Sequence, residues 1–159
     1  MEGNKEMTDK ENFIRNTFPK LLETLEPMQM GKWGKMNAQQ MVEHMAEYVR
    51  IASGKELYES QYPPEIVERS YAFMMSEKPF KENTPNKLLP DEPRPVQHVL
   101  MSDAIKELRN EIADFFDTYE SNPGLRNMSP FFGNLNFEEQ VQLLHKHATH
   151  HARQFGLVE

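Results

Sequence analysis

Apolar residues return every three or four positions along most of the chain, which is the spacing of helices that bury one face. This pattern predicts four long amphipathic helices at about 9–25, 38–53, 103–120 and 137–155, and a shorter helix at about 64–75. There is no convincing strand pattern and no internal repeat. The expected fold class is all-α, a four-helix bundle with an insertion between its second and third long helices.

The ends of the predicted helices carry residues that commonly cap helices. Thr8, Asn37 and Asn136 are each followed three positions later by Glu or Gln, which is the arrangement of a capping box. Ser102 is the expected N-cap of the third long helix. Pro19 lies inside the first helix and is expected to kink it, because its ring removes one backbone hydrogen bond and crowds the preceding turn.

The insertion is rich in proline. Residues 55–101 hold Pro63, Pro64, Pro79, Pro85, Pro90, Pro93 and Pro95 out of the chain's 11 prolines. Its second part, about 76–101, is expected to be an irregular crossover, and loops of that length are usually functional or partly mobile. The sequence leaves open whether this crossover is a lid or a static connection. The chain of 159 residues suits one domain, expected at 8–159 after a disordered tail at 1–7.

Charge and composition exclude several classes of function. With 25 acidic residues against 18 Lys and Arg, the chain lacks the basic balance of a protein that binds nucleic acid or an anionic membrane. The absence of cysteine excludes disulfides, thiol catalysis and Cys-ligated zinc, and fits a reducing cytoplasm. No apolar run approaches the roughly 20 residues of a membrane span, and the polar N-terminus does not resemble a signal peptide. We therefore expect a cytoplasmic protein that binds neither nucleic acid nor a membrane.

Four of the 6 histidines lie close together in the sequence LLHKHATHHARQFG near the C-terminus. At about 100° per residue, His151 falls in the middle of the apolar stripe of its helix and His147 on the edge, whereas His145 and His150 fall just outside. His147 and His151 are four positions apart, so their imidazoles can bind one metal ion from one helix face. Ala148 stands where an HExxH peptidase carries its glutamate, which disfavours that class of enzyme.

A third imidazole is available from His44, which lies at the centre of the apolar stripe of the second long helix. Three imidazoles with one open position form the ligand set of catalytic zinc, and they also suit nickel or iron. Two alternatives remain open. Inward histidines are often only packed in a core, and a histidine cluster can also act as a pH switch that titrates near pH 6–7.

Other polar and aromatic residues receive simpler interpretations. We expect His98 at the surface and Trp33 as an anchor against the bundle end, with a place for Trp33 in a substrate pocket as the alternative. Gln40 and Glu47 flank His44 in the sequence. One of them could form a hydrogen bond to a metal ligand. Because both side chains are polar, the favoured interpretation is that they face solvent.

Two segments carry a family resemblance. MNAQQMVEHMAEYVRIASGK and SPFFGNLNFEEQVQLLHKHATHHARQFGL resemble the DinB/YfiT-like superfamily of metal-binding four-helix bundles, and especially an uncharacterised branch with a PFFG loop and a KHxxHHxxQFG helix. The resemblance implies an up-down-down-up bundle, often a homodimer, that binds zinc or nickel through His44, His147 and His151. The chain departs from the commoner HHRGQ ending, because Ala152 follows His151.

The resemblance also implies an activity, since characterised relatives include transferases that use the low-molecular-weight thiols bacillithiol or mycothiol. We expect a metal-dependent enzyme that carries out thiol transfer or hydrolysis on a small molecule. The substrate would enter near residues 76–101 and 127–135. The alternative is a non-catalytic, metal-stabilised helical bundle with a structural or interaction role, in which protein groups fill every ligand position.

Overall fold

The computed structural model describes residues 7–83 and 92–159, and within these the chain is mostly helical with one small antiparallel sheet. The predicted tail at 1–7 lies outside the described residues except for Met7, which is exposed. The elements in chain order are α1 (Asp9–Asn12), η1 (Phe13–Thr17), α2 (Phe18–Leu22), α3 (Ala38–Ser53), α4 (Pro64–Met75), α5 (Met101–Ser121), β1 (Asn127–Ser129), β2 (Gly133–Leu135) and α6 (Phe137–Gln154).

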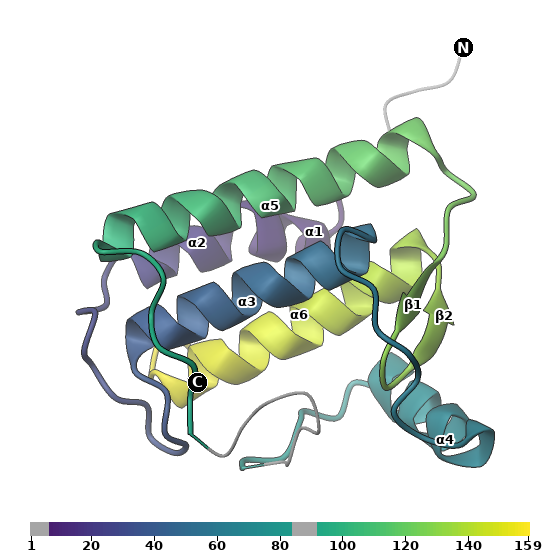
Figure 1. Ribbon diagram of the computed structural model, residues 1–159, viewed down its shortest axis with the longest axis horizontal. Coiled ribbons are helices and arrows are strands. Elements are labelled where there is room, and N and C mark those ends of the chain that lie inside the picture. Colours follow the sequence, from purple (N-terminus) through teal and green to yellow (C-terminus); the bar gives the residue numbers. More distant parts are fainter. Residues whose placement is uncertain (1–6, 84–91) are drawn as a thin grey trace.

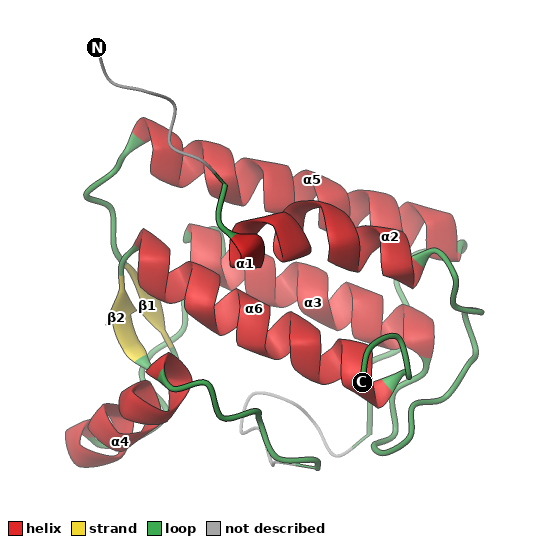
Figure 2. Ribbon diagram, turned by 180° about the vertical axis from the view of Figure 1, so that it is seen from behind, coloured by secondary structure: helices red, strands yellow, loops and turns green. Residues whose placement is uncertain are grey.

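The long helices lie side by side. Helices α3, α5 and α6 run along one another, with α1, η1 and α2 as one continuous helical segment beside α5 and α6, while α4 and the sheet lie at one end (Figures 1 and 2). The inward residues of these four helical segments form one hydrophobic core, which includes Phe18, Leu22, Met41, Leu108, Phe115 and Leu144. The apolar spacing in the sequence therefore identified the buried faces correctly.

The first helical segment differs from its prediction. Residues 13–17 form a π-helical turn, and the helix ends at Leu22, earlier than predicted. Pro19 has no N–H to donate, and the wide turn that precedes it makes room for its ring without breaking the segment. A π turn therefore precedes the position where the sequence predicted a kink. Leu25 lies beyond the helix and is still buried, after a series of tight backbone turns at residues 23–25.

Three of the four expected helix caps are present. The side chains of Thr8, Asn37 and Asn136 each accept a backbone N–H three residues ahead, and the boxes at Asn37 and Asn136 are reciprocal. The expected cap at Ser102 is wrong, because α5 already begins at Met101 and Leu100 takes the N-cap position without a side-chain hydrogen bond. The chain is extended at Leu100, and the helix begins two residues earlier than the sequence indicated.

The small sheet is a correction to the all-α prediction. Strands β1 and β2 pair antiparallel, with Met128 opposite Asn134, and Pro130–Phe132 form the turn between them. Gly133 closes this turn at φ 93°, a backbone conformation that suits glycine. Strands of three residues are too short to leave an alternating pattern in the sequence, which explains why they were not predicted.

In residues 7–83 and 92–159, no helix is both long enough and apolar enough to cross a membrane.

Candidate metal centre

Helices α3 and α6 bring the three predicted ligands together. The Nε2 atom of His147 lies 3.1 Å from Nε2 of His44 and 3.0 Å from Nε2 of His151. His44 and His151 are buried, and His147 is half-buried, in agreement with its predicted position at the edge of the apolar stripe. Among the described residues, this is the one group of three or more His, Cys, Asp or Glu side chains whose geometry could hold a metal ion.

Two of the three nitrogen separations are close to those around a single ion, and the donor atoms of all three rings lie within 4.8 Å of one another. Zinc binds imidazole nitrogens at about 2.0–2.1 Å, so two nitrogens of a tetrahedral site stand about 3.3 Å apart. The 3.0 and 3.1 Å separations lie within a small side-chain adjustment of that value. Because all three donors are neutral imidazoles, the set suits zinc, nickel or iron and does not distinguish them.

The protonation state also suits metal binding. Burial lowers the pKa of His44 to about 4, with smaller contributions from the positive charges of Arg94 and His150. Burial likewise holds the pKa values of His147 and His151 well below the usual value, and the neighbouring imidazoles add to the effect. All three rings are therefore neutral at pH 7, and each can offer a lone pair.

Gln154 fixes the orientation of His151. Its Oε1 lies 2.7 Å from His151 Nδ1, and its Nε2 donates to the backbone carbonyl of Trp33 at 2.9 Å. Because the amide oxygen only accepts, Nδ1 of His151 carries the hydrogen and Nε2 is left with the lone pair that faces the cluster. The Gln154 backbone carbonyl also accepts the N–H of Lys32 at 2.7 Å, so the same residue fastens the loop that carries Trp33.

The sequence analysis missed this role of Gln154 and considered Gln40 and Glu47 for it. Gln40 completes the cap of α3 and donates to the carbonyl of Arg94. Both carboxylate oxygens of Glu47 accept from the single nitrogen Nη1 of Arg94. A signal for Gln154 was present, since it follows His151 by three positions on the same helix.

His44 has no such support. Its Nδ1 is buried without a hydrogen-bond partner among the described residues.

The remaining histidines lie outside the cluster. His145 packs against Phe13, with ring centroids 5.4 Å apart, on the far side of α6 from the three ligands. His150 packs against Trp33 at 5.5 Å and lines the cavity described below, as does Trp33 itself, which matches the pocket alternative for that residue. His98 is half-buried, and its Nε2 lies 2.6 Å from a Glu107 oxygen, which raises its pKa.

A cavity of about 960 Å³ leads to the three histidines, all of which line it. Its walls come from the loop with Trp33, from α3, α4 and α6, from the crossover on both sides of the residues that are not described, and from the turn between β1 and β2. The two segments where we expected a substrate to enter, 76–101 and 127–135, thus both contribute to its lining. Pockets of this size accommodate small organic molecules.

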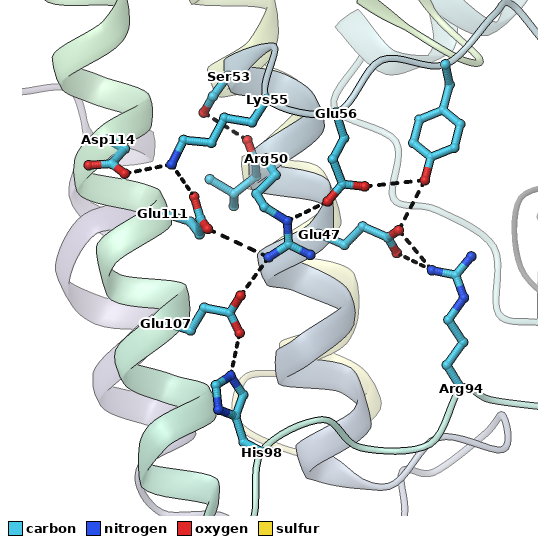
Figure 3. A network of polar contacts seen from close by, with 12 residues as sticks. Glu47, Arg50, Ser53, Lys55, Glu56, Arg94, His98, Glu107, Glu111 and Asp114 are labelled. Carbon is cyan, nitrogen blue, oxygen red and sulfur yellow. Dashed lines mark hydrogen bonds and ion pairs between the residues drawn. The ribbon is translucent and has the colours of Figure 1, made fainter.

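The crossover after residue 91 is tied firmly to α3. Glu43 accepts the backbone N–H groups of Gln97 at 2.7 Å and His98 at 3.2 Å, and Nη1 of Arg94 donates to both carboxylate oxygens of Glu47 at 2.9 Å. Figure 3 shows how this pair joins a larger network. The part of the predicted crossover at 84–91 lies outside the described residues. The part at 92–98 is held against α3 by these hydrogen bonds, and it lines the cavity through Pro93, Arg94, Pro95 and Gln97.

The network in Figure 3 also joins α3 to α5. Arg50 donates to Glu56 at 2.5 Å and to Glu107 at 2.8 Å, and Glu107 in turn contacts His98. Lys55 bridges Glu111 and Asp114 on α5 in the same way. Ion pairs that share partners in a partly buried network hold their helices more firmly than isolated surface pairs do.

Comparisons with protein-family models, with curated proteins and with solved structures return no match. The resemblance to the DinB/YfiT-like superfamily therefore rests on the sequence motifs alone.

Proposed function

We propose that this protein is a metal-dependent enzyme of the DinB/YfiT-like type, with its four long helical segments arranged as the bundle of that superfamily. His44, His147 and His151 bind one divalent ion, zinc or nickel. The observation that supports this best is the convergence of the Nε2 atoms of three neutral imidazoles in the lining of a large cavity. A cavity that reaches the imidazoles favours an enzyme over the structural alternative, in which a fourth protein ligand would complete the site.

The ion supplies one kind of chemistry when bound, because it lowers the pKa of a coordinated water or thiol towards neutrality. The chain's own residues prepare the site for it. Gln154 holds the His151 ring with Nε2 facing the cluster, and Tyr48 packs its ring 4.8 Å from that of His44 and 5.0 Å from that of His147. The half-buried position of His147 leaves the cluster accessible from the cavity side. Thiol transfer to an electrophile or hydrolysis of a small molecule are the reactions that we propose.

Cobalt substitution tests whether the site has an open position. Protein prepared without a histidine tag and freed of metal with EDTA should bind one Co²⁺ per chain, with visible absorption bands typical of a tetrahedral site. Addition of azide or a small thiol should shift these bands, because either can occupy a free position. Bands that form but do not respond to azide or thiol would indicate a closed structural site and reject the enzyme proposal.

Histidine variants provide the matched controls. His44→Gln, His147→Gln and His151→Gln should each abolish stoichiometric Co²⁺ binding, whereas His145→Gln should retain it, because that ring packs against Phe13 away from the cluster. The reaction itself is tested by assaying the metal-loaded protein with low-molecular-weight thiols and electrophilic acceptors. The proposal also includes a cytoplasmic location and a homodimer, and light scattering on the purified protein tests the second of these.

A further inference from the structure

One wall of the cavity is built from aromatic rings that begin beside the metal centre. The ring of Phe80 lies 6.2 Å from that of His147, and further rings follow at centroid distances of 5.6–6.3 Å. We call this surface the aromatic wall, made of Tyr62, Phe73, Phe80, Phe131 and Phe132. Its members come from α4 and its preceding loop, from the crossover and from the turn between β1 and β2.

The aromatic wall is not part of the hydrophobic core. None of its five side chains belongs to the core cluster or to the partly buried residues packed on it, and all five line the cavity instead. Each such ring carries a large apolar surface, which is costly to leave facing water. Aromatic faces arranged in sequence along a cavity are suited to a flat, apolar molecular body, which they contact by stacking and edge-to-face packing.

The charge of the cavity points to an anion. The described residues that line it include five Lys and Arg but only three Glu, although the whole chain carries 18 Lys and Arg against 25 Asp and Glu. Burying or confining a ligand beside this excess of positive charge favours a negative group on the ligand. The lining is therefore less acidic in composition than the whole chain, and the cations in it that lack an acidic partner decide where an anion can bind.

Arg69 of α4 is the cation in this lining that is best placed to take such a group. Lys35, Arg50 and Arg94 are engaged in ion pairs with glutamates, and Lys81 also has an interaction partner. Arg69 forms no ion pair or hydrogen bond with any residue in the described part of the chain. A guanidinium presents a planar fork of donors that matches a carboxylate.

We propose that the cavity binds a planar aromatic anion of the aromatic carboxylate class, with its rings on the aromatic wall and its negative group at Arg69. That such a molecule is the substrate rests on the proposed function. The binding itself depends on side chains of the wall and of α4, so it can be tested with and without metal.

Calorimetric titration of the full chain with three probes tests this inference. 2-Naphthoate carries both the rings and the charge, 2-naphthylmethanol carries only the rings, and acetate carries only the charge. The proposal predicts that 2-naphthoate binds at least about tenfold more tightly than either of the others, equivalent to about 1.4 kcal/mol. The preference should persist in EDTA-treated protein. Equal affinity for the three probes, or no binding of 2-naphthoate, would overturn the inference.

Variants with matched controls locate the binding. Phe80→Leu should weaken 2-naphthoate binding about fivefold, the scale of one lost ring contact, while Phe13→Leu outside the cavity leaves it unchanged. Arg69→Gln should remove the preference for 2-naphthoate over 2-naphthylmethanol, while Arg109→Gln on α5 does not. The preference for 2-naphthoate over 2-naphthylmethanol could instead be lost on EDTA treatment and kept in Arg69→Gln. That result would show that the metal ion alone selects the charged probe, and it would contradict the proposal. If the protein binds no metal, the proposed enzyme function is rejected. The titrations still test binding of the aromatic anion, because they do not require the metal.

Discussion

Oε1 of Gln154 accepts a hydrogen bond from Nδ1 of His151 at 2.7 Å, while the other end of the same amide donates to the carbonyl of Trp33. One side chain therefore orients a candidate metal ligand and holds the loop that forms part of the cavity. The candidate metal centre is thus joined directly to the loop with Trp33, which lines the cavity from which a ligand would approach.

Gln154→Ala should weaken metal binding about 10–100-fold, because loss of a hydrogen-bond partner behind a histidine ligand typically has that effect. Gln154→Glu keeps an acceptor for Nδ1 and should retain most of the affinity. Arg153→Ala, one position earlier on the same turn, serves as the control. Competition of Zn²⁺ with a chromophoric chelator measures all three. If Gln154→Ala and the parent protein bind Zn²⁺ with equal affinity, Gln154 does not orient His151 for metal binding.

The sequence predicted α3 within its observed bounds, because Asn37 and Gly54 mark both ends of a regular apolar stripe. It also selected His44, His147 and His151, since helical phase alone separates them from His145 and His150. These features depend on local spacing, which a single sequence contains. The metal, the bundle family and the reaction remain predictions.

Other features depend on tertiary contacts and could not be predicted from spacing. Pro19 predicts a disturbance of the first helix, but apolar spacing does not tell a π turn from a kink or a break. The start of α5 follows a crossover whose contacts with α3, such as His98 N–H to Glu43, join residues far apart in the sequence. Gln154 acts through Trp33, which lies 121 positions away in the sequence. The aromatic wall likewise combines three separate segments, each of which contributes only one or two rings.

Gly31→Ala should loosen the Trp33 loop. A Cβ atom at Gly31 would lie 2.7 Å from Cγ of Gln154, with backbone oxygens at 3.1 and 3.2 Å, so the loop must shift. Overpacking of this kind typically costs about 1–3 kcal/mol. Trp33 is the only tryptophan of the chain, so its fluorescence reports the loop directly.

Gly124→Ala is the matched control, because no atom lies within 4 Å of a Cβ at that position. It should leave both the fluorescence spectrum and the melting temperature nearly unchanged. If Gly31→Ala also leaves both unchanged, the close contact between this loop and Gln154 is not present in solution.

The metal-free protein should lose stability on acidification. Burial depresses the pKa of His44 from 6.5 to about 4 in the folded state, so the unfolded chain binds the proton first as the pH falls. The stabilisation is complete above about pH 6.5 and is lost as the pH falls towards 4, by roughly 3 kcal/mol for this residue. His147 and His151 act in the same direction.

Urea unfolding of EDTA-treated protein at several pH values measures this effect, and His44→Gln should flatten the dependence. A parent protein whose unfolding free energy is the same at pH 5 and pH 7 would show that the histidines are not buried as described. The result also bears on the pH-switch alternative, because burial moves the titration of the folded cluster below the pH 6–7 expected from the sequence.

Glu43→Ala should loosen the attachment of residues 92–98 to α3. The carboxylate accepts the N–H groups of Gln97 and His98, and Gln39 also donates to it. Hydrogen exchange at these two amides should accelerate in the variant, because both lose their acceptor. Glu68→Ala on the exposed face of α4 is the control. Unchanged exchange at both amides in Glu43→Ala would show that other contacts hold this part of the crossover.

The central claim is that His44, His147 and His151 form one metal site, and elemental analysis of protein purified without a histidine tag tests it most directly. We predict about one equivalent of zinc or nickel per chain, removed by EDTA, restored by adding either metal, and absent from His44→Gln. A parent protein that contains substoichiometric metal and takes up neither zinc nor nickel would contradict the account.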